Sequence, residues 1–331
     1  MLTLKKVTLK EIADQLNVSV NTVSLVLRNQ PGISKETRQS VLSMAEKLGY
    51  RPRTAPSWRS VLILSNIENT DDTYFSNAFF KLIKMELELN GCIPFTLHSL
   101  NTVSQEHVRE VIQEKNIDGI VVIDEIGELH AVQLQSIGLP VVLYGFYFPK
   151  IPFNSVMEDN ISAMSLIVSQ LAAKGYRNIG FIGGLDSSKS FSERWLGTVL
   201  AIKNEGLSLN MEHMFISQTY SECCDVGYLS RLFAGRSLPD ALLCGNDKIA
   251  MASIKALGQI GYSVPKDIGV VGFDNSELAS LCIPTLTTID NNSNLQAHTV
   301  VQRLLSMMDS DQLTTIERII TPVSLVEGES C

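Results

Sequence analysis

Polar residues that can bind hydroxyl groups follow two short apolar runs in the second half of the chain. Asn246 and Asp247 come directly after DALLCG at 240–245, and Asp274 ends DIGVVGFD at 267–274. If both runs are parallel strands, their carboxyl ends lie at one edge of a sheet, where α/β proteins bind ligands. Carboxylate and carboxamide groups suit the hydroxyls of a small polyol. Asp274 is the strongest candidate, because Asp247 has a competing role as a helix N-cap, which we expect to be its main one.

Residues 183–190, GGLDSSKS, approach a phosphate-binding P-loop but lack one of its glycines. Ser188 stands where the motif needs glycine before Lys189, and a side chain there crowds the amides that hold phosphate. Neither HxxxH nor HExxH spacing occurs among the five histidines, which are His98, His107, His130, His213 and His298. Because nothing assembles a nucleophile, a base and an orienting group, the sequence predicts no enzyme activity.

The cysteines and the apolar runs place the chain in a reducing compartment. Six cysteines show no CxxC pair and no His/Cys metal spacing, so we expect thiols, no metal and no cofactor. No run reaches the length of a membrane span, and MLTLKK at the start lacks the apolar core of a signal peptide. The sequence therefore predicts a cytoplasmic protein.

Residues 8–29, TLKEIADQLNVSVNTVSLVLRN, point to nucleic-acid recognition. Thr8 and Glu11 form a capping box before an apolar stripe at 9, 12, 13 and 16. Asn17 can take the left-handed conformation of a tight helix exit, and Ser19 can cap a second helix. The pattern predicts a helix-turn-helix, and an ordinary helical hairpin of an all-α cap remains the alternative. A third helix, starting at Ser34, would complete a small core.

The charge is divided unevenly along the 331 residues. The net charge is −8, yet residues 1–60 carry ten Lys and Arg against four Asp and Glu, while the rest carries 17 against 31. A basic head on an acidic body is typical of a phosphate-binding module joined to a part with another partner.

The chain after the head predicts an α/β sensor. RPRTAPSWRS at 51–60 has two prolines and no periodicity, which indicates a linker. Apolar strand patterns follow in two series: 61–64, 92–97, 119–123 and 140–144, then 178–184, 240–245 and 267–274. Helical patterns at 74–90, 104–116 and 129–137 lie between the strands of the first series. This order predicts two lobes, each a doubly wound parallel sheet.

The residues now quoted resemble a known family. The stretch 7–52, with its helix-turn-helix pattern, and DALLCGNDKIAMASIKALGQIGYSVPKDIGVVGFDN at 240–275 are similar to the lactose-repressor/galactose-repressor family. The resemblance implies a homodimer on a two-fold symmetric operator, with a sensor like periplasmic sugar-binding proteins of type I. It implies a DNA-binding domain at 1–50, a hinge at 51–59 and a sensor at 60–331. Lobe 1 would take about 60–160 and 290–320, and lobe 2 about 161–289 and 321–331.

The resemblance also implies DNA contacts in and around the second helix, at Thr8, Ser19, Val20, Asn21, Thr22, Ser24, Leu25, Arg28, Tyr50 and Trp58. Asn21 can pair with adenine and Val20 can meet a thymine methyl. Leu25 stands where many members place an arginine that reads guanine, so the operator should lack that preference. The linker is several residues shorter than in the family and contains Pro56, so we expect no regular hinge helix, with Trp58 or the arginines taking part of its role.

Effector contacts implied by the resemblance fall on Tyr74, Phe75, Asp159, Arg194, Tyr220, Asn246 and Asp274. Each has an ordinary alternative: Tyr74 and Phe75 could begin a core helix face, and Arg194 could be solvated. The sequence predicts a DNA-binding repressor controlled by a small molecule, of which a sugar or sugar derivative is the best candidate. A nucleobase-type corepressor stays open, and so does a binding protein or sugar-modifying enzyme without operator-binding activity.

Overall fold

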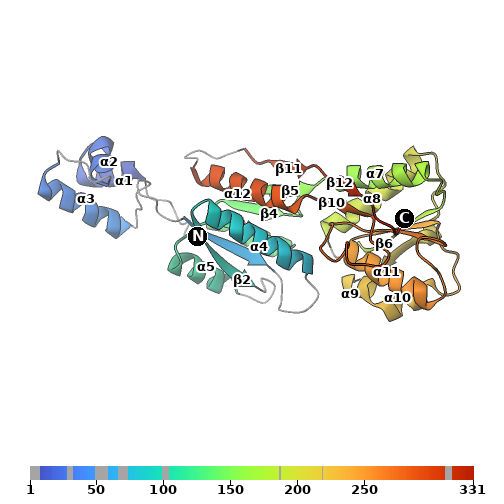
Figure 1. The fold of residues 1–331 in the computed structure, drawn as a ribbon. Helices are drawn as coiled ribbons and strands as arrows, with labels where there is room; N and C mark the ends of the chain where they lie inside the picture. Colours follow the sequence, from blue (N-terminus) through green and yellow to red (C-terminus); the bar gives the residue numbers. More distant parts are fainter. Residues whose placement is uncertain are drawn as a thin grey trace.

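The computed structural model describes residues 8–27, 33–48, 59–65, 74–98, 104–185, 188–217, 219–309 and 315–331, without the side chains of Leu27, Glu46, Gln105 and residues 74–77. Along these ranges, a small helical head precedes a sensor of two α/β lobes (Figure 1). The expected DNA contacts of Arg28, Tyr50 and Trp58 and the hinge hypothesis fall outside the described residues, as do the side chains of Tyr74 and Phe75.

Three helices form the head: α1 (Leu9–Leu16), α2 (Val20–Leu27) and α3 (Lys35–Leu48). The predicted capping box is confirmed, because the Glu11 amide donates to the Thr8 hydroxyl at 3.2 Å and the Thr8 amide donates to the Glu11 carboxylate at 2.8 Å. Asn17 has a φ of 51°, the left-handed conformation expected at this helix exit. The head core consists of two buried side chains from each helix: Ile12, Ala13, Val23, Val26, Val41 and Ala45.

Lobe 1 is built on a six-stranded sheet in which every pairing is parallel, in the order β11-β5-β4-β3-β1-β2. The strands are β1 (Arg59–Ser65), β2 (Cys92–His98), β3 (Ile117–Val122), β4 (Val141–Tyr144), β5 (Asn154–Glu158) and β11 (Arg318–Thr321). Two helices cover each face: α4 (Tyr74–Leu89) and α12 (Ser293–Asp309) on one, α5 (Gln105–Glu114) and α6 (Glu128–Ile137) on the other.

Strand β1 shows why the apolar run at 61–64 is continuous. Val61 and Ile63 pack with side chains of α4 and α12, while Leu62 and Leu64 pack with those of α5 and α6. All four side chains are fully buried. A strand that is covered on both faces has no solvent side, so it needs no alternating polar residues.

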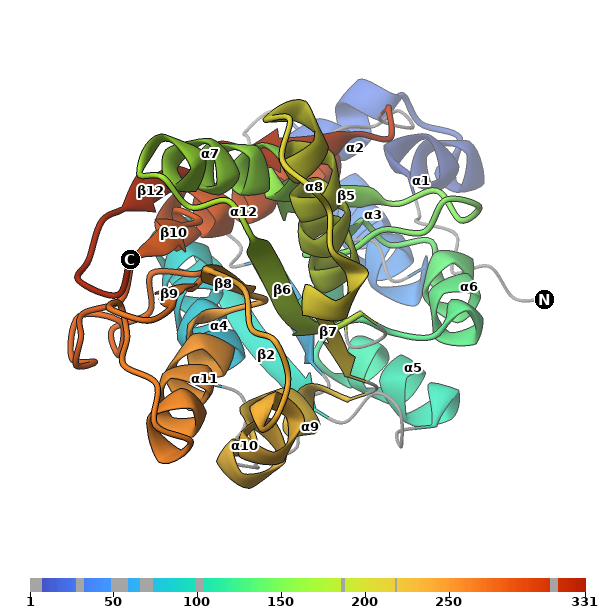
Figure 2. The ribbon, with the colours of Figure 1, turned by 90° about the vertical axis from the view of Figure 1, so that its right-hand side faces the viewer.

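Lobe 2 has a four-stranded parallel sheet in the order β7-β6-β8-β9. Its strands are β6 (Ile179–Gly184), β7 (Met214–Ser217), β8 (Ala241–Cys244) and β9 (Gly269–Val271). Figure 2 shows α7 (Asn160–Ala173) and α8 (Lys189–Asn204) on one face, and α9 (Tyr220–Cys224), α10 (Val226–Phe233) and α11 (Asp247–Gln259) on the other. None of the described helices of either lobe is long and apolar enough to cross a membrane.

The chain passes between the lobes three times. It leaves lobe 1 from β5 into α7, returns from β10 (Thr288–Asp290) into α12, and leaves again from β11 into β12 (Ser324–Val326). Strands β10 and β12 pair in an antiparallel ribbon, and Ile289 of this ribbon packs in the core of lobe 2. Each lobe is therefore assembled from segments that are far apart in sequence.

Candidate functional site

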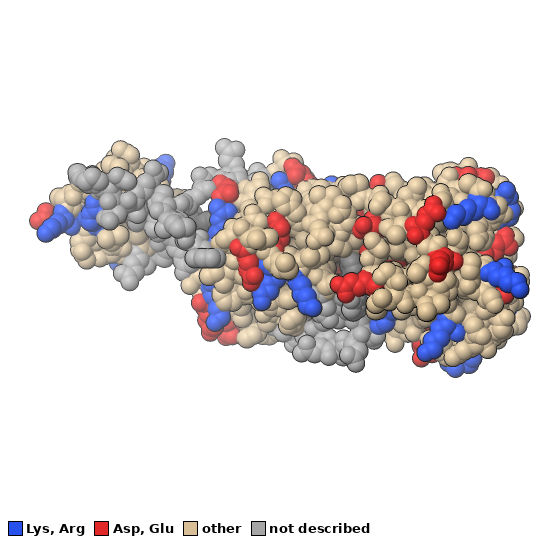
Figure 3. Space-filling view, in the orientation of Figure 1, with Lys and Arg blue, Asp and Glu red and all other residues tan. Residues whose placement is uncertain are grey.

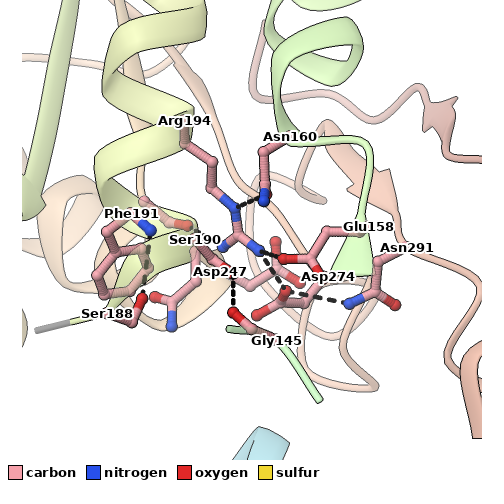
Figure 4. Close-up of polar contacts among 12 residues, drawn as sticks. Gly145, Glu158, Asn160, Ser188, Ser190, Phe191, Arg194, Asp247, Asp274 and Asn291 are labelled. Atoms are coloured by element: carbon pink, nitrogen blue, oxygen red, sulfur yellow. Dashed lines mark hydrogen bonds and ion pairs between the residues drawn. The ribbon is translucent and has the colours of Figure 1, made fainter. Parts of the chain in front are cut away.

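Arg194 of α8 lies at the lobe junction, by which we mean the region where the carboxyl ends of β5 and β9 meet helix α8 (Figure 4). Its Nε donates to Asn160 Oδ1 at 2.9 Å, and its Nη2 donates to Glu158 Oε1 at 2.8 Å. Its Nη1 donates to the carbonyl oxygen of Gly245 at 2.6 Å. The side chain is 5% exposed, which excludes the alternative of a solvated helix arginine.

The guanidinium of Arg194 also lies against aromatic rings of lobe 2. Its central carbon is 3.5 Å from the ring centroid of Phe273 and 5.7 Å from that of Phe191. A cation over a ring face is attracted by the negative charge density there. Arg194 is consequently held from several sides, by polar groups of both lobes and by stacking.

Asp274 follows β9 and points toward the same cluster (Figure 4). Its Oδ1 lies 3.8 Å from Arg194 Nη2 and accepts a hydrogen bond from Asn291 Nδ2 at 3.3 Å. Burial raises the pKa of Asp274 well above its usual range; the Arg194 charge opposes this rise, and the nearby Asp247 and Glu158 carboxylates add to it. Burial therefore disfavours the charged form of this carboxyl group, while the Arg194 guanidinium favours it.

The expectation that Asp247 is mainly a helix cap is wrong. Asn246 is the N-cap of α11, because its Oδ1 accepts from the Ile249 amide at 3.0 Å. Asp247 instead holds the chain after β9, accepting from the Ser276 amide at 2.7 Å and from the Thr288 hydroxyl. Capping belongs to the residue whose own backbone is extended, and here that is the residue before the aspartate.

Asn246 and Tyr220, both predicted to contact the effector, lie beside each other. Asn246 Nδ2 donates to the Tyr220 hydroxyl at 3.1 Å, and the Tyr220 ring stacks on Phe191 with centroids 5.9 Å apart. Burial raises the pKa of Tyr220 above its ordinary value, so it stays a neutral hydrogen-bonding group. Phe191 therefore lies between this pair and Arg194, because its ring stacks on Tyr220 and is also near the Arg194 guanidinium.

Asp159 takes a different place from its neighbours. It caps α7 by accepting from the Ser162 amide at 3.0 Å, whereas Glu158 before it and Asn160 after it both contact Arg194. Glu158 ends β5, Asp159 is the N-cap and Asn160 begins α7, so the chain changes direction here and the two neighbours of the cap reach Arg194. The two neighbours of Asp159, and not Asp159 itself, contact Arg194, and its effector contact stays a prediction.

The P-loop-like stretch is part of a helix start and not a phosphate nest in its described residues. The Ser188 hydroxyl caps α8 by accepting from the Phe191 amide at 3.2 Å. The Lys189 ammonium lies over the ring of Tyr147, 5.1 Å from its centroid. No group of three or more potential metal ligands occurs among the described residues.

The second helix of the head presents short side chains to solvent. Ser19 accepts from the Thr22 amide at 2.9 Å, and this fixes the start of α2. Val20 and Asn21 are exposed there, while Val23 and Val26 are buried in the head core. Thr22, Ser24 and Leu25 are half-buried. The exposed start of α2 is the part that a helix-turn-helix inserts into the major groove.

Comparison with known proteins matches both parts of the chain. Residues 8–53 match the family described as "Bacterial regulatory proteins, lacI family", and residues 168–331 match the "Periplasmic binding protein-like domain". The chain belongs to the lacI family. This lacI-family chain is a DNA-binding transcriptional regulator, with the helix-turn-helix head and two-lobed sensor that were expected.

Relatives match this lacI-family regulator along most of its length. The "HTH-type transcriptional regulator MalR" of Streptomyces coelicolor is 27% identical over 331 residues, which cover 97% of this chain and 96% of the relative. The "HTH-type transcriptional repressor PurR" of Aliivibrio salmonicida is 29% identical over 311 residues, covering 90% of this chain and 91% of the relative.

Solved structures share the fold of the lacI-family chain. The complex of the transcriptional regulator CelR with cellobiose has a TM-score of 0.73 at 22% identity, covering 98% of this chain and 100% of that one. The lac repressor dimer bound to operator and the anti-inducer ONPF has a TM-score of 0.69 at 21% identity, covering 98% and 99%.

Asp274→Asn should stabilise the lacI-family regulator at neutral and alkaline pH. A carboxyl group whose pKa is higher in the folded than in the unfolded state destabilises the fold once pH exceeds both values. We therefore expect a melting temperature about 2–4 °C higher per kcal/mol of relieved cost at pH 8. This difference should shrink as pH falls toward about 4, the unfolded pKa of aspartate.

Asparagine also suits the backbone at this position, where φ is 108°. The measurement is a thermal melt from pH 4 to pH 8, with the exposed Asp14→Asn in the head as the matched control. A melting temperature at pH 8 that is equal to or below that of the unmodified protein would contradict the prediction.

Proposed function

We propose that the regulator is a repressor whose operator affinity is set by a sugar or sugar derivative bound at the lobe junction, and that it acts as a homodimer. The observation that carries this proposal is the cluster around Arg194, which draws Glu158 from the end of β5 and Asp274 from the loop after β9. Acidic, amide and guanidinium groups around one small region are the groups that bind polyols.

A ligand at this place can control the head because the cluster belongs to both lobes. Binding that favours one relative position of the lobes shifts the population toward it. In a dimer, such a shift changes the spacing of two recognition helices, and operator half-sites fix that spacing. We propose the head at 1–50, the hinge at 51–59 and the sensor at 60–331 as the units of this movement. Coupling of about 1–3 kcal/mol is typical of such regulators.

The names of similar proteins support a sugar as the class of effector. The solved neighbours include a CelR–cellobiose complex and a LacI-type regulator of Alkaliphilus metalliredigens complexed with D-xylulofuranose. Two relatives carry the name PurR, and a nucleobase-type corepressor therefore belongs in the same ligand screen.

Exposed apolar side chains on both lobes support the homodimer. Met85, Leu89 and Ile93 of lobe 1 are 57%, 80% and 41% exposed, and Leu281 and Ile283 of lobe 2 are 75% and 91% exposed. Contiguous apolar side chains in solvent are typical of a surface that another subunit covers, and Met85 and Leu89 lie about one turn apart on α4. On the face in Figure 3 acidic and basic side chains are interspersed along the sensor, so neither sign would repel a second copy there.

A mobility-shift assay with genomic fragments tests the operator-binding half of the proposal. We expect selective retardation of few fragments, with affinity that falls steeply as salt rises because phosphate contacts release counterions. A binding protein or sugar-modifying enzyme without operator affinity would retard no fragment selectively at low salt. Absence of selective retardation would therefore contradict the proposal.

A thermal-shift screen of sugars and nucleobases tests the effector half. A ligand present at 100 times its dissociation constant adds about 2.7 kcal/mol of stability, which is readily measured. The ligand found in this way is then added to the mobility-shift assay. An inducing sugar should weaken the retarded band, whereas a corepressor should strengthen it.

A further inference from the structure

We infer that the effector carries no acidic group, and that it is a free, unphosphorylated sugar or a similar non-acidic polyol. This inference rests on the proposed function and narrows it. The reason is that lobe 1 supplies two carboxylates, Glu158 and Glu125, to the two groups of lobe 2 that are best suited to receive an anion. Those groups are the Arg194 guanidinium and the amino end of α8.

Arg194 has no complete edge left for a ligand carboxylate or phosphate. Such anions bind arginine through two parallel N–H donors on one edge of the guanidinium. Here Nε donates to Asn160, Nη1 to Gly245 and Nη2 to Glu158, so each edge already has a donor engaged by the protein. Both Arg194 and Glu158 are 4% exposed, so solvent does not screen the interaction between their charges.

The charges of the cluster also disfavour an acidic ligand. Glu158 and Asp274 flank the single guanidinium, and Asp247 lies close enough to raise the pKa of Asp274. A further negative charge would face these acids in a region of low dielectric constant, where repulsion is strong. Neutral hydroxyl groups, by contrast, can donate to the same carboxylate oxygens.

Other cations near the junction are engaged by aromatic rings. The Lys189 ammonium and the Arg318 guanidinium both lie over Tyr147, 5.1 Å and 3.2 Å from the ring centroid. The Lys248 ammonium lies 5.7 Å from the ring centroid of Tyr220. These contacts hold the three charges at ring faces.

The amino end of α8 gives an independent second observation. A helix of 16 residues favours negative charge at this end, where backbone amides point outward. The Lys189 amide donates to the exposed Glu125 carboxylate of lobe 1, and the Phe191 amide donates to the Ser188 hydroxyl. The Ser190 hydroxyl donates to the Gly145 carbonyl at 3.3 Å, also in lobe 1. A sugar phosphate would have to displace Glu125 to use this end.

The test is calorimetric titration of the full-length protein with matched sugar pairs. The probes are glucose, galactose, fructose, ribose, maltose, trehalose and cellobiose, each beside its monophosphate, together with glucuronate and galacturonate. In every pair for which binding is detected, we expect the uncharged sugar to bind about tenfold more tightly or better. The reason is that one added negative charge facing the acidic groups weakens binding by about this factor. A phosphate or uronate that binds more tightly than its uncharged partner would overturn the inference while leaving the sugar-sensing proposal standing.

Two variants and one control complete the test. Glu158→Gln and Glu125→Gln each keep an oxygen acceptor and remove one charge. Each should therefore lower, by about tenfold, the ratio between the dissociation constants of an acidic probe and its neutral partner. Glu212→Gln, at an exposed glutamate of lobe 2, should leave the affinities for the acidic and the neutral probes unchanged. An unaltered preference in both junction variants would contradict the inference. If Glu158→Gln fails to fold, Glu125→Gln and the unmodified protein still decide. If no probe binds, the sugar-sensing proposal fails, and this inference fails with it.

Discussion

Replacing Arg194 with alanine should abolish the thermal response to sugar and strongly destabilise the sensor. The guanidinium is the only described cation in contact with both Glu158 and Asp274, and all three side chains are buried. Removing one partner of a buried ion pair leaves an uncompensated charge, which typically costs about 3–5 kcal/mol. Chemical denaturation should show this loss in the sensor transition, and a thermal-shift titration should show no sugar effect.

A double variant separates the charge effect from lost packing. In Arg194→Met with Glu158→Gln, the unpaired carboxylate is removed and an apolar side chain fills part of the space. We expect it to recover much of the stability and none of the sugar response, because the hydrogen bonds to Asn160 and Gly245 remain lost. If Arg194→Ala alone is as stable as the unmodified protein, the junction is not organised around this ion pair.

Ile12→Ala should abolish operator binding and leave the sugar response unchanged. Ile12 is fully buried in the head core, which contains only head residues. Loss of a buried isoleucine costs about 2–5 kcal/mol, and a unit of some fifty residues has little stability to spare. The variant should give no retarded band in the mobility-shift assay.

The exposed Leu42→Ala of α3 is the matched control, because Leu42 is 45% exposed and outside the head core. It should retain operator affinity. Calorimetric titration of Ile12→Ala with the effector should match the unmodified protein, since the sensor has its own cores. Operator affinity retained by Ile12→Ala would show that the head does not depend on this core.

Much of the fold could be predicted because its signals are local. The capping box at Thr8 and Glu11, the left-handed Asn17 and the buried run at 61–64 each involve neighbouring residues only. The predicted helices at 74–90, 104–116 and 129–137 agree with α4, α5 and α6 to within two residues. Strands β5 and β10 were not predicted, because polar residues interrupt their short apolar pattern, and neither was β7.

The site was only partly predictable, since its geometry depends on parts of the chain brought together by the fold. Asp159 was expected to contact the effector and Asp247 to cap a helix, yet Asp159 caps α7 and Asp247 holds the loop after β9. Glu158 and Asn160 contact Arg194 because β5 ends beside α8, which only the lobe arrangement determines. Similarly, the buried bond from the Tyr144 hydroxyl to Gln296 joins residues that are 152 positions apart.

The three crossings between the lobes have a consequence for protein synthesis. The head is complete once residue 48 has emerged, whereas the lobe 1 sheet lacks its edge strand until β11, at Arg318–Thr321, has been made. Lobe 2 waits longer still, because the Ser330 hydroxyl donates to the carbonyl oxygen of Val270. A chain that ends early would therefore carry a folded reader of DNA without a folded sensor. The order of elements makes regulation the last property that the nascent protein acquires.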